Sequence, residues 1–500
     1  MRKIPVTMAT QHPDNAGKPY WYTRPFISTS AEIKECFLCF SDLGIDEYNW
    51  DWEGKFVDEA VVDRLLHEHY DYFKKHPLGE DKFLTFRIPN PRVEKQFRLA
   101  RAFMVMITSS QLSQSLGFEK APIFETILPL TETAEEIIDI QEAFRELVGI
   151  EHRLLKMEDS IKFIEIIPLF EQVSKIIDSP MILKKYINMH KKMFGRKPQY
   201  LRPYCARSDP ALNSGLIPTI LALKVALSSY LDLEKETGVR LYPMLGTGSL
   251  PFRGGLSPER LDLILEEYKG VRTLTLQSAF RYDYKLADIK KAIQKLHEKL
   301  PKTSAQKLKK EVVENIKKCI PKFETAYRDS IENIAPLINK ISSTVARRRE
   351  RLQHIGLFGY SRGIGKVKLP RAIPFTASLY SIGVPPELIG TGRGIKHAIS
   401  LGIWPKVKEC YSYIKEDLIQ AGYFLNRQNL ENFAKTKNVW RDIMEDIDII
   451  EKEFQITLGP VESFQLEHLQ ITQKIYERLK DNKDITQLVT YGGILRKSLG

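Results

Sequence analysis

The feature of the sequence that most restricts the fold is an alternation of short apolar runs with helical patterns in the first part of the chain. About eight runs rich in β-branched and aromatic residues are typical of strands. They cover residues 4–12, 36–42, 83–89, 122–129, 163–171, 200–209, 241–248 and 273–280. Most are followed by a segment of helical periodicity, such as residues 59–74. Alternating strands and helices form a parallel sheet, and about eight such units over roughly 280 residues predict an α/β fold, a (β/α)8 TIM-type barrel.

Polar side chains stand at or just past the carboxyl ends of several runs. They are His12, Arg87, Glu171, Asp209 and the glycine-rich segment GTGSLPFRGG at residues 246–255. A barrel of this type builds its active site at that end of the strands. A single polar residue can end any strand, but the recurrence across separate strands favours one shared site.

The chain changes character in its second half. Residues 285–353 have a charged, helical pattern, and the stretch that starts at His354 is rich in glycine, proline and basic residues. Residues 385–477 read mostly as helix. We therefore expect a barrel with the active site at residues 1–284 and a mainly helical region at residues 285–500 that packs on the barrel and contributes loops to its mouth.

Composition sets limits on partners and compartment. The 500 residues are 43% hydrophobic and 28% charged, as in ordinary globular proteins, and the net charge of +12 favours anionic partners. Those partners are nucleic acid or small phosphorylated and carboxylated metabolites. No aromatic RNA-binding motif, helix-turn-helix signature or basic tail accompanies the charge, so we expect no nucleic-acid binding. Lys224 interrupts the longest apolar run, at residues 217–230, so we expect no membrane span.

The cysteines argue for a reducing compartment. There are five, an odd number without a disulfide framework, and the start of the sequence lacks the apolar core of a signal peptide, so we expect a cytoplasmic protein. Cys36 and Cys39 form one CxxC motif with no second pair or histidines at zinc-site spacing. Their apolar neighbours predict a buried strand with both thiols in the core.

The glycine-rich segment has the composition of an anion site. Glycines let backbone N–H groups approach an anion, and Arg253 adds a guanidinium fork that suits phosphate or carboxylate. The segment lacks the Walker A spacing GxxxxGK[ST]. By itself it is a weak signal for phosphate binding, and a plain glycine-rich turn is the alternative interpretation.

The strand-end carboxylates and histidine leave two interpretations open. Glu171 and Asp209 end consecutive predicted strands and could hold one Mg²⁺, which prefers oxygen ligands, or each could cap the helix that follows. His12 precedes a proline turn and could transfer protons near neutral pH, or it could bind local backbone.

Together the motifs resemble the archaeal-type phosphoenolpyruvate carboxylases, and the resemblance runs from Ile4 to Gly500. The motifs are TMATQHPDN, FLTFRIPNP, IIPLFE, ARSDPALNSG, GTGSLPFRGG, QSAFRYD, GYSRGIGKVKLPRAIPF and GVPPELIGTG. The resemblance implies a (β/α)8 barrel with added helices, a homotetramer, and Mg²⁺ or Mn²⁺ as cofactor. It also implies conversion of phosphoenolpyruvate and bicarbonate to oxaloacetate and phosphate through carboxyphosphate and an enolate, an anaplerotic fixation of CO₂.

The resemblance further implies roles for individual residues. His12 resembles the catalytic histidine, Arg253 the essential arginine of the glycine-rich loop, and Glu171 and Asp209 the metal carboxylates. The implied substrate-binding residues are Arg87, Arg371, Gly254 and Ser249.

The chain departs from the larger enzymes of this family at three positions. Leu212 stands where they carry a lysine, and Leu245 and Thr247 stand where they carry a histidine and a second arginine. Other cations must supply the missing charge, and the candidates are Arg202, Arg207, Arg281 and Arg362. The main rival function is another Mg²⁺-dependent barrel that acts on phosphoenolpyruvate or pyruvate, such as a mutase or a C–C lyase. Strict dependence on bicarbonate separates the two.

Overall fold

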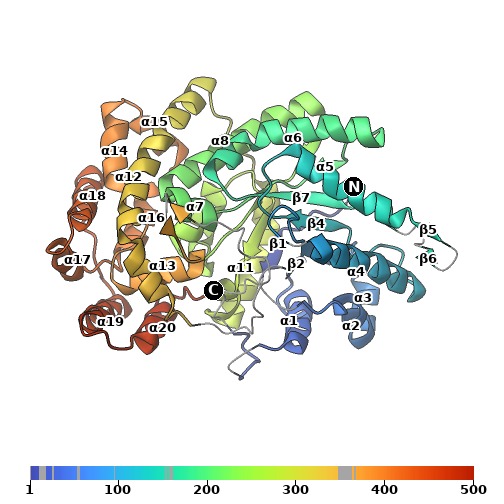
Figure 1. The fold of residues 1–500 in the computed structure, drawn as a ribbon, viewed down its shortest axis with the longest axis horizontal. Helices are drawn as coiled ribbons and strands as arrows, with labels where there is room; N and C mark the ends of the chain where they lie inside the picture. The colour runs from blue at the N-terminus through green and yellow to red at the C-terminus, as the bar shows by residue number, and fades with distance from the viewer. Residues whose placement is uncertain are drawn as a thin grey trace.

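The fold is built around one closed barrel of parallel strands (Figure 1). The computed structural model describes residues 2–10, 18–24, 27–52, 57–94, 96–152, 155–156, 161–346, 363–364 and 367–500. The barrel order is β1-β12-β11-β9-β7-β4-β3-β2, and β1 closes the ring by pairing with both β12 and β2. This confirms the predicted (β/α)8 TIM-type barrel with an additional helical part.

The eight barrel strands are short and almost entirely buried. They are β1 (Thr7–Thr10), β2 (Glu47–Asp51), β3 (Phe83–Arg87), β4 (Glu125–Leu128), β7 (Glu165–Phe170), β9 (Tyr204–Cys205), β11 (Met244–Leu245) and β12 (Thr273–Leu276). In the described part of the chain, three two-stranded pairs lie outside the barrel: β8 (Tyr200–Leu201) with β10 (Arg240–Leu241), β5 (Glu151–His152) with β6 (Leu155–Lys156), and β13 (Gly363–Ile364) with β14 (Val367–Lys368).

One predicted strand is wrong. Residues 36–41 belong to helix α1 (Thr29–Ser41), Asp42 caps its carboxyl end, and the second barrel strand is β2. Cys36, Cys39 and Phe40 are buried at the spacing i, i+3, i+4, which is one face of a helix, and the Ser28 side chain caps the helix by accepting the N–H of Ala31. Both thiols are in the core, as expected.

Helices follow the barrel strands and cover the outside of the ring (Figure 1). They are α1, α2 (Val61–Glu68), α3 (Tyr70–Lys75), α4 (Gln96–Ser115), α5 (Ala134–Val148), α6 (Val173–Phe194), α7 (Ser208–Ser214), α8 (Leu216–Thr237), α9 (Leu261–Glu267), α10 (Ser278–Tyr282) and α11 (Leu286–Lys299). The described residues of this part also form the 3₁₀ turns η1 (Pro251–Arg253), η2 (Pro258–Arg260) and η3 (Leu300–Lys302).

The second half of the chain is mostly helical in the described residues. Its helices are α12 (Lys310–Ser342), α13 (Ala372–Ser381), α14 (Thr391–Ser400), α15 (Trp404–Cys410), α16 (Ile414–Gly422), α17 (Arg427–Ala434), α18 (Val439–Phe454), α19 (Ser463–Lys480) and α20 (Thr486–Leu495). The long helix α12 packs against α8 of the barrel and against α13, α14 and α18. It therefore joins the helical region to the barrel.

Helices α8 and α11 show that the barrel and the helical region pack together closely. Helix α8 is the one helix in the described part of the chain that is long and apolar enough to cross a membrane, but 78% of its most apolar stretch is buried. It packs between α6 and α12, so its apolar side chains belong to the core. Helix α11 follows the predicted boundary at residue 284 and contacts β1 through His297, whose Nε2 lies 3.3 Å from Thr7 Oγ1. The division at residue 284 stays a prediction.

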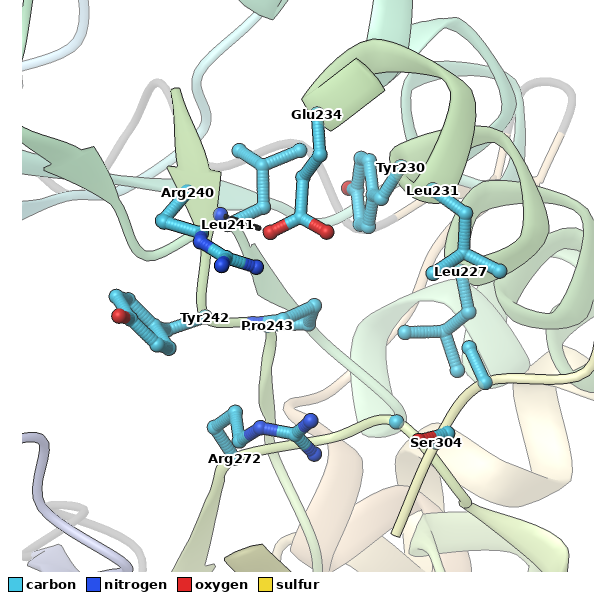
Figure 2. A pocket seen from close by; sticks show the side chains of 12 residues that line it. Leu227, Tyr230, Leu231, Glu234, Arg240, Leu241, Tyr242, Pro243, Arg272 and Ser304 are labelled. Carbon is cyan, nitrogen blue, oxygen red and sulfur yellow. Dashed lines mark hydrogen bonds between the residues drawn. The ribbon is translucent and has the colours of Figure 1, made fainter. Parts of the chain in front are cut away.

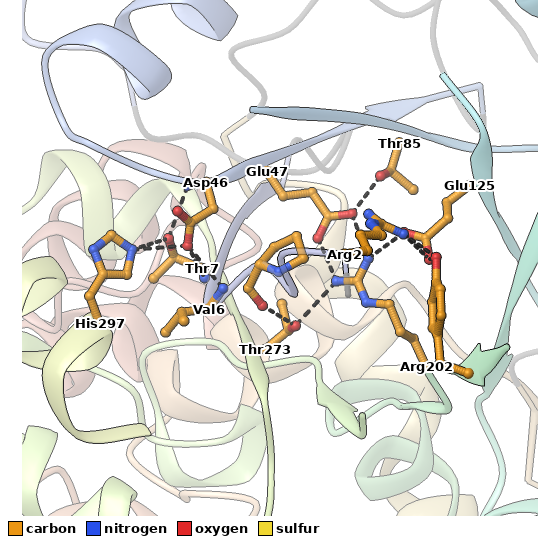
Figure 3. Close-up of polar contacts among 12 residues, drawn as sticks. Arg2, Val6, Thr7, Asp46, Glu47, Thr85, Glu125, Arg202, Thr273 and His297 are labelled. Atoms are coloured by element: carbon orange, nitrogen blue, oxygen red, sulfur yellow. Dashed lines mark hydrogen bonds and ion pairs between the residues drawn. The ribbon is translucent and has the colours of Figure 1, made fainter. Parts of the chain in front are cut away.

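The barrel interior has layers of different chemistry. At the amino ends of the strands lies a cluster of charged and polar side chains (Figure 3). The middle is apolar, and its side chains come from five strands: Met8, Ile127, Ile167, Leu169, Tyr204 and Met244. The carboxyl ends carry polar residues again. A filled apolar layer therefore separates the two polar ends.

The charged layer at the amino ends is centred on Arg202. This guanidinium is fully buried and lies 2.6 Å from Glu47 Oε2 and 2.7 Å from Glu125 Oε2. It also donates to Thr273 Oγ1 at 3.1 Å (Figure 3). The prediction that Arg202 supplies charge at the active site is wrong, because both carboxylates that hold it begin their strands, at the opposite end of the barrel.

Replacing Arg202 tests how much the fold depends on this layer. Arg202→Met leaves Glu47 and Glu125 buried without their shared cation, and such losses cost about 3–5 kcal/mol. We expect the free energy of unfolding in urea to fall by that amount. Lys235→Met, an exposed change on α8, is the matched control and should stay within about 0.5 kcal/mol of wild type. A wild-type unfolding curve for Arg202→Met would contradict the structural role.

Candidate active site

The glycine-rich segment forms a compact loop directly after β11. The Thr247 N–H donates to Thr275 Oγ1 at 2.8 Å, and Thr247 Oγ1 donates to the Thr275 carbonyl at 2.6 Å, so the loop is tied to β12. The Gly248 N–H donates to the Arg253 carbonyl at 2.7 Å and closes the loop on itself. Strand β12 thus fixes the loop at the carboxyl end of the barrel.

Two glycines in this loop are required by space and backbone geometry. The side chain of Arg253 crosses Gly248 so closely that a Cβ there would lie 3.0 Å from Arg253 Cζ. Gly254 has φ +123°, and a Cβ there would lie 3.1 Å from Thr247 Cα. Gly254 therefore shapes the loop, and its predicted contact with substrate stays a prediction.

Arg253 is buried in this loop, with 2% of its surface exposed. Its Nη1 donates to the Gly500 carbonyl at 3.1 Å, and its Nη2 donates to Gln277 Oε1 just after β12. Two residues far apart in the sequence, Gln277 and Gly500, thus hold one guanidinium at the strand ends. Ser249, in the same loop, has a buried Oγ without a hydrogen-bond partner among the described residues, so this hydroxyl is available to a ligand.

The remaining candidate cations differ sharply in position. Arg207, just after β9, is buried and donates from Nη2 to the Pro251 carbonyl of the glycine-rich loop at 3.1 Å. Its Nε and Nη1 have no hydrogen-bond partner in the described part of the chain. Arg281 instead braces the end of β1 by donating to the Thr10 carbonyl at 2.8 Å and to Cys39 Sγ at 3.1 Å. Arg362 lies outside the described residues.

The two predicted metal carboxylates follow adjacent strands, since β7 pairs with β9. Glu171 comes directly after β7, is buried, and accepts the Leu130 N–H on Oε2 at 2.7 Å. Leu130 has φ +54°, in the left-handed region. This conformation costs a residue other than glycine about 1–3 kcal/mol, and residues that adopt it are often found at functional sites. Asp209 lies in the first turn of α7, partly exposed.

Arg87 ends β3 and is buried against a partner that the sequence analysis missed. Its Nε and Nη2 donate to the two carboxylate oxygens of Asp51 at 2.9 and 2.6 Å. Asp51 ends β2, so the incorrect assignment of the second strand hid it from the pattern of strand-end polar residues. The predicted binding of substrate by Arg87 is untested, with two of its three nitrogens turned toward Asp51.

The helical region reaches the same end of the barrel. Arg371 is the residue before α13, and α13 packs against α7, the helix that contains Asp209. Helix α7 also contacts η1, which contains Arg253. The structure thus brings together the segments of three predicted site residues. His12 lies outside the described residues, and its role stays a prediction.

Comparison with known proteins agrees with this arrangement. The family model described as "Phosphoenolpyruvate carboxylase" matches residues 4–500. The chain belongs to the phosphoenolpyruvate carboxylase family. Curated relatives named phosphoenolpyruvate carboxylase include those of Leuconostoc mesenteroides (39% identical, covering 100% of this chain and 99% of the relative) and Metallosphaera sedula (38%, 100% of both). That of Methanothermobacter thermautotrophicus is 35% identical, again over 100% of both chains.

Phosphoenolpyruvate carboxylases use a divalent metal ion, and the donor set here fits one. Glu171 and Asp209 offer hard carboxylate oxygens at the ends of neighbouring strands. Among the described residues, no group of three or more His, Cys, Asp or Glu side chains is placed to hold a metal. Two protein carboxylates leave coordination positions to water and substrate, which is the usual pattern for Mg²⁺.

Glu387 is a second residue that the sequence analysis missed, and it contacts the glycine-rich loop. It lies in the helical region, fully buried, and its Oε1 accepts the Phe252 N–H at 3.0 Å and the Tyr380 hydroxyl at 2.8 Å. Phe252 precedes Arg253, so this carboxyl holds the glycine-rich loop from the side of the helical region. Burial raises the pKa of Glu387 to about 7, although the bonds from Phe252 and Tyr380 favour the charged form.

The raised pKa of Glu387 predicts a pH dependence of stability. Between pH 4.5 and about 7 the folded chain keeps a proton that an unfolded glutamate releases, so stability falls as pH rises through this window. The full difference is about 3 kcal/mol, since one pKa unit is worth about 1.4 kcal/mol. Glu387→Gln should therefore show a flatter dependence of unfolding free energy on pH than wild type.

A second test variant and one control accompany this measurement. Glu165 at the start of β7 also has its pKa raised to about 7 by burial, with Glu125 adding to the effect, so Glu165→Gln should flatten the profile as well. Glu477 is exposed on α19, and Glu477→Gln is the control. It should leave the slope of unfolding free energy against pH as in wild type. A slope in Glu387→Gln equal to that of wild type would refute the assignment.

Proposed function

We propose that this protein catalyses the carboxylation of phosphoenolpyruvate by bicarbonate, forming oxaloacetate and phosphate, at the carboxyl ends of the barrel strands. The observation that carries the proposal is the full-length family match, which spans residues 4–500. The buried Arg253, held where β11 and β12 end, supports it, because a fixed guanidinium at that rim suits a phosphorylated substrate. The relatives that carry this name are carboxy-lyases.

Charge neutralisation is the first task of the site, because bicarbonate must attack an anionic phosphate. Arg253 and Arg371 bind the phosphate in this proposal, and Arg207 beside the loop compensates for the cations replaced by Leu245 and Thr247. The Ser249 hydroxyl and the backbone at Gly254 complete the loop side of the phosphate site. Arg87 orients the substrate from the opposite strands, with Asp51 fixing its guanidinium.

Proton transfer is the second task. Attack of bicarbonate on phosphorus breaks the bond to the enol oxygen and gives carboxyphosphate and the enolate of pyruvate. His12 accepts the carboxyl proton of carboxyphosphate, which then separates into CO₂ and phosphate, and histidine suits this step because imidazole groups exchange protons near neutral pH. The enolate carbon attacks CO₂ to form oxaloacetate. Water must be excluded, because protonation of the enolate would yield pyruvate instead.

Glu171 and Asp209 hold the divalent ion in this proposal, either Mg²⁺ or Mn²⁺. When bound, the ion supplies positive charge beside the phosphate and the developing enolate. The Leu130 N–H donates to Glu171 Oε2 and so orients this carboxylate.

We also infer a cytoplasmic homotetramer. The five cysteines are all free and buried, which supports a reducing compartment. The support for the tetramer is the resemblance to the larger enzymes of the family.

The activity is tested by a coupled assay. Phosphoenolpyruvate, Mg²⁺ and bicarbonate are supplied, and oxaloacetate is followed through malate dehydrogenase as loss of NADH. We expect strict dependence on bicarbonate, because bicarbonate supplies the new carboxylate. Turnover of phosphoenolpyruvate without bicarbonate would favour the mutase or lyase alternative. His12→Asn should abolish oxaloacetate formation, and full carboxylation by this variant would remove His12 from the mechanism.

The metal assignment is tested through metal dependence. Glu171→Gln and Asp209→Asn each remove one charged ligand, so we expect the Mg²⁺ concentration for half-maximal rate to rise at least about tenfold, or activity to be lost. Glu165→Gln, at the other end of strand β7, is the matched control and should keep the wild-type Mg²⁺ dependence. Unchanged dependence in both site variants would exclude these carboxylates as ligands.

A further inference from the structure

A cavity lies at the amino ends of the strands, away from the proposed active site. It has a volume of about 360 Å³ and lies between α8 and the segment around Ser304 (Figure 2). Its apolar side is formed by Leu227, Tyr230 and Leu231 of α8 together with Leu241. This volume falls within the range of about 300–1,000 Å³ that is usual for small-molecule sites.

Two arginines give this cavity its chemical character. Arg240 lies in β10, and Arg272 directly precedes β12. Both side chains line the cavity and are directed into the space beside α8 (Figure 2). Within the described chain neither guanidinium forms an ion pair, and the one hydrogen bond of the Arg272 side chain goes to the Val271 carbonyl at 3.2 Å.

The surroundings only partly balance these charges. Glu234 is the acidic residue in the lining, and its Oε1 is occupied by the Leu241 N–H at 2.7 Å. Burial lowers the pKa of Arg272, and the opposing effects of Glu234 and Tyr242 do not offset it. The cavity therefore carries two guanidinium groups against one carboxylate, next to an apolar wall.

We propose that this cavity binds a small organic anion whose single carboxylate or phosphate is held by Arg240 and Arg272 and whose apolar part lies against Leu227, Tyr230 and Leu231. A guanidinium fork recognises either group through paired hydrogen bonds, and two forks at one cavity favour one shared acceptor. The apolar wall selects a ligand with a hydrocarbon or aromatic body over inorganic phosphate. This site is independent of the proposed carboxylase activity.

The proposal is tested by calorimetric titration of the full chain with three probes. Phenyl phosphate and benzoate share an aromatic body and differ in the anionic group, and inorganic phosphate lacks the body. We expect phenyl phosphate, benzoate or both to bind more tightly than inorganic phosphate, and the preferred probe identifies the anionic group. Binding of neither aromatic probe at about 1 mM would overturn the proposal.

Variants assign the binding to this cavity and not to the phosphate site at the other end of the barrel. Arg240→Gln/Arg272→Gln should weaken binding of the preferred probe at least about tenfold, because charge-assisted bonds are lost. Lys235→Gln, an exposed change nearby on α8, removes a charge outside the cavity and should bind like wild type. Equal affinity in the double variant and wild type would place the bound probe elsewhere and overturn the assignment.

A single variant covers the case in which loss of Arg272 disturbs folding. Arg240 is exposed, so Arg240→Gln keeps the core intact, and circular dichroism and thermal unfolding check this directly. We expect the single variant to weaken binding severalfold, and unchanged affinity with a wild-type unfolding curve would overturn the proposal.

Discussion

Closure of the barrel is the constraint on which the rest of the structure depends. β1 pairs with β2 on one side and with β12, the last barrel strand, on the other, so no strand edge is left open. Because all eight strands run parallel, closure places every carboxyl end on one rim. Loops from β2, β3, β7, β9 and β11 can then meet there although they are separated by up to about two hundred residues.

Inside the barrel, charge is divided between two ends with an apolar layer in between. At the amino ends, Arg202 is neutralised by Glu47 and Glu125 and has a structural role. At the carboxyl ends, Arg253 donates to the Gln277 amide oxygen and to the backbone oxygen of Gly500, and Arg207 donates to the Pro251 carbonyl. Arg207, which donates to a neutral carbonyl, is suited to an anionic ligand, whereas Arg202 between two carboxylates is not.

The helical region is part of the site because it holds the glycine-rich loop from outside the barrel. Glu387 accepts the Phe252 N–H, and α13 packs on α7 next to η1. The position of Arg253 therefore depends on β12, on Gly500 and on the helical region together. The family match likewise extends beyond the barrel and covers residues 4–500.

The sequence by itself determined the barrel, most of its strands and the end of the strands at which the polar residues gather. These follow from local periodicity and from strand-end positions, which short stretches of chain contain. It could not distinguish the helix at residues 36–41 from a strand, because a short apolar run fits both and the choice depends on which face is buried. It also could not separate Arg202 from Arg207, which lie five positions apart in one predicted strand. Only the tertiary structure placed the first between two carboxylates at the amino end and the second beside the glycine-rich loop, because these partners come from distant strands.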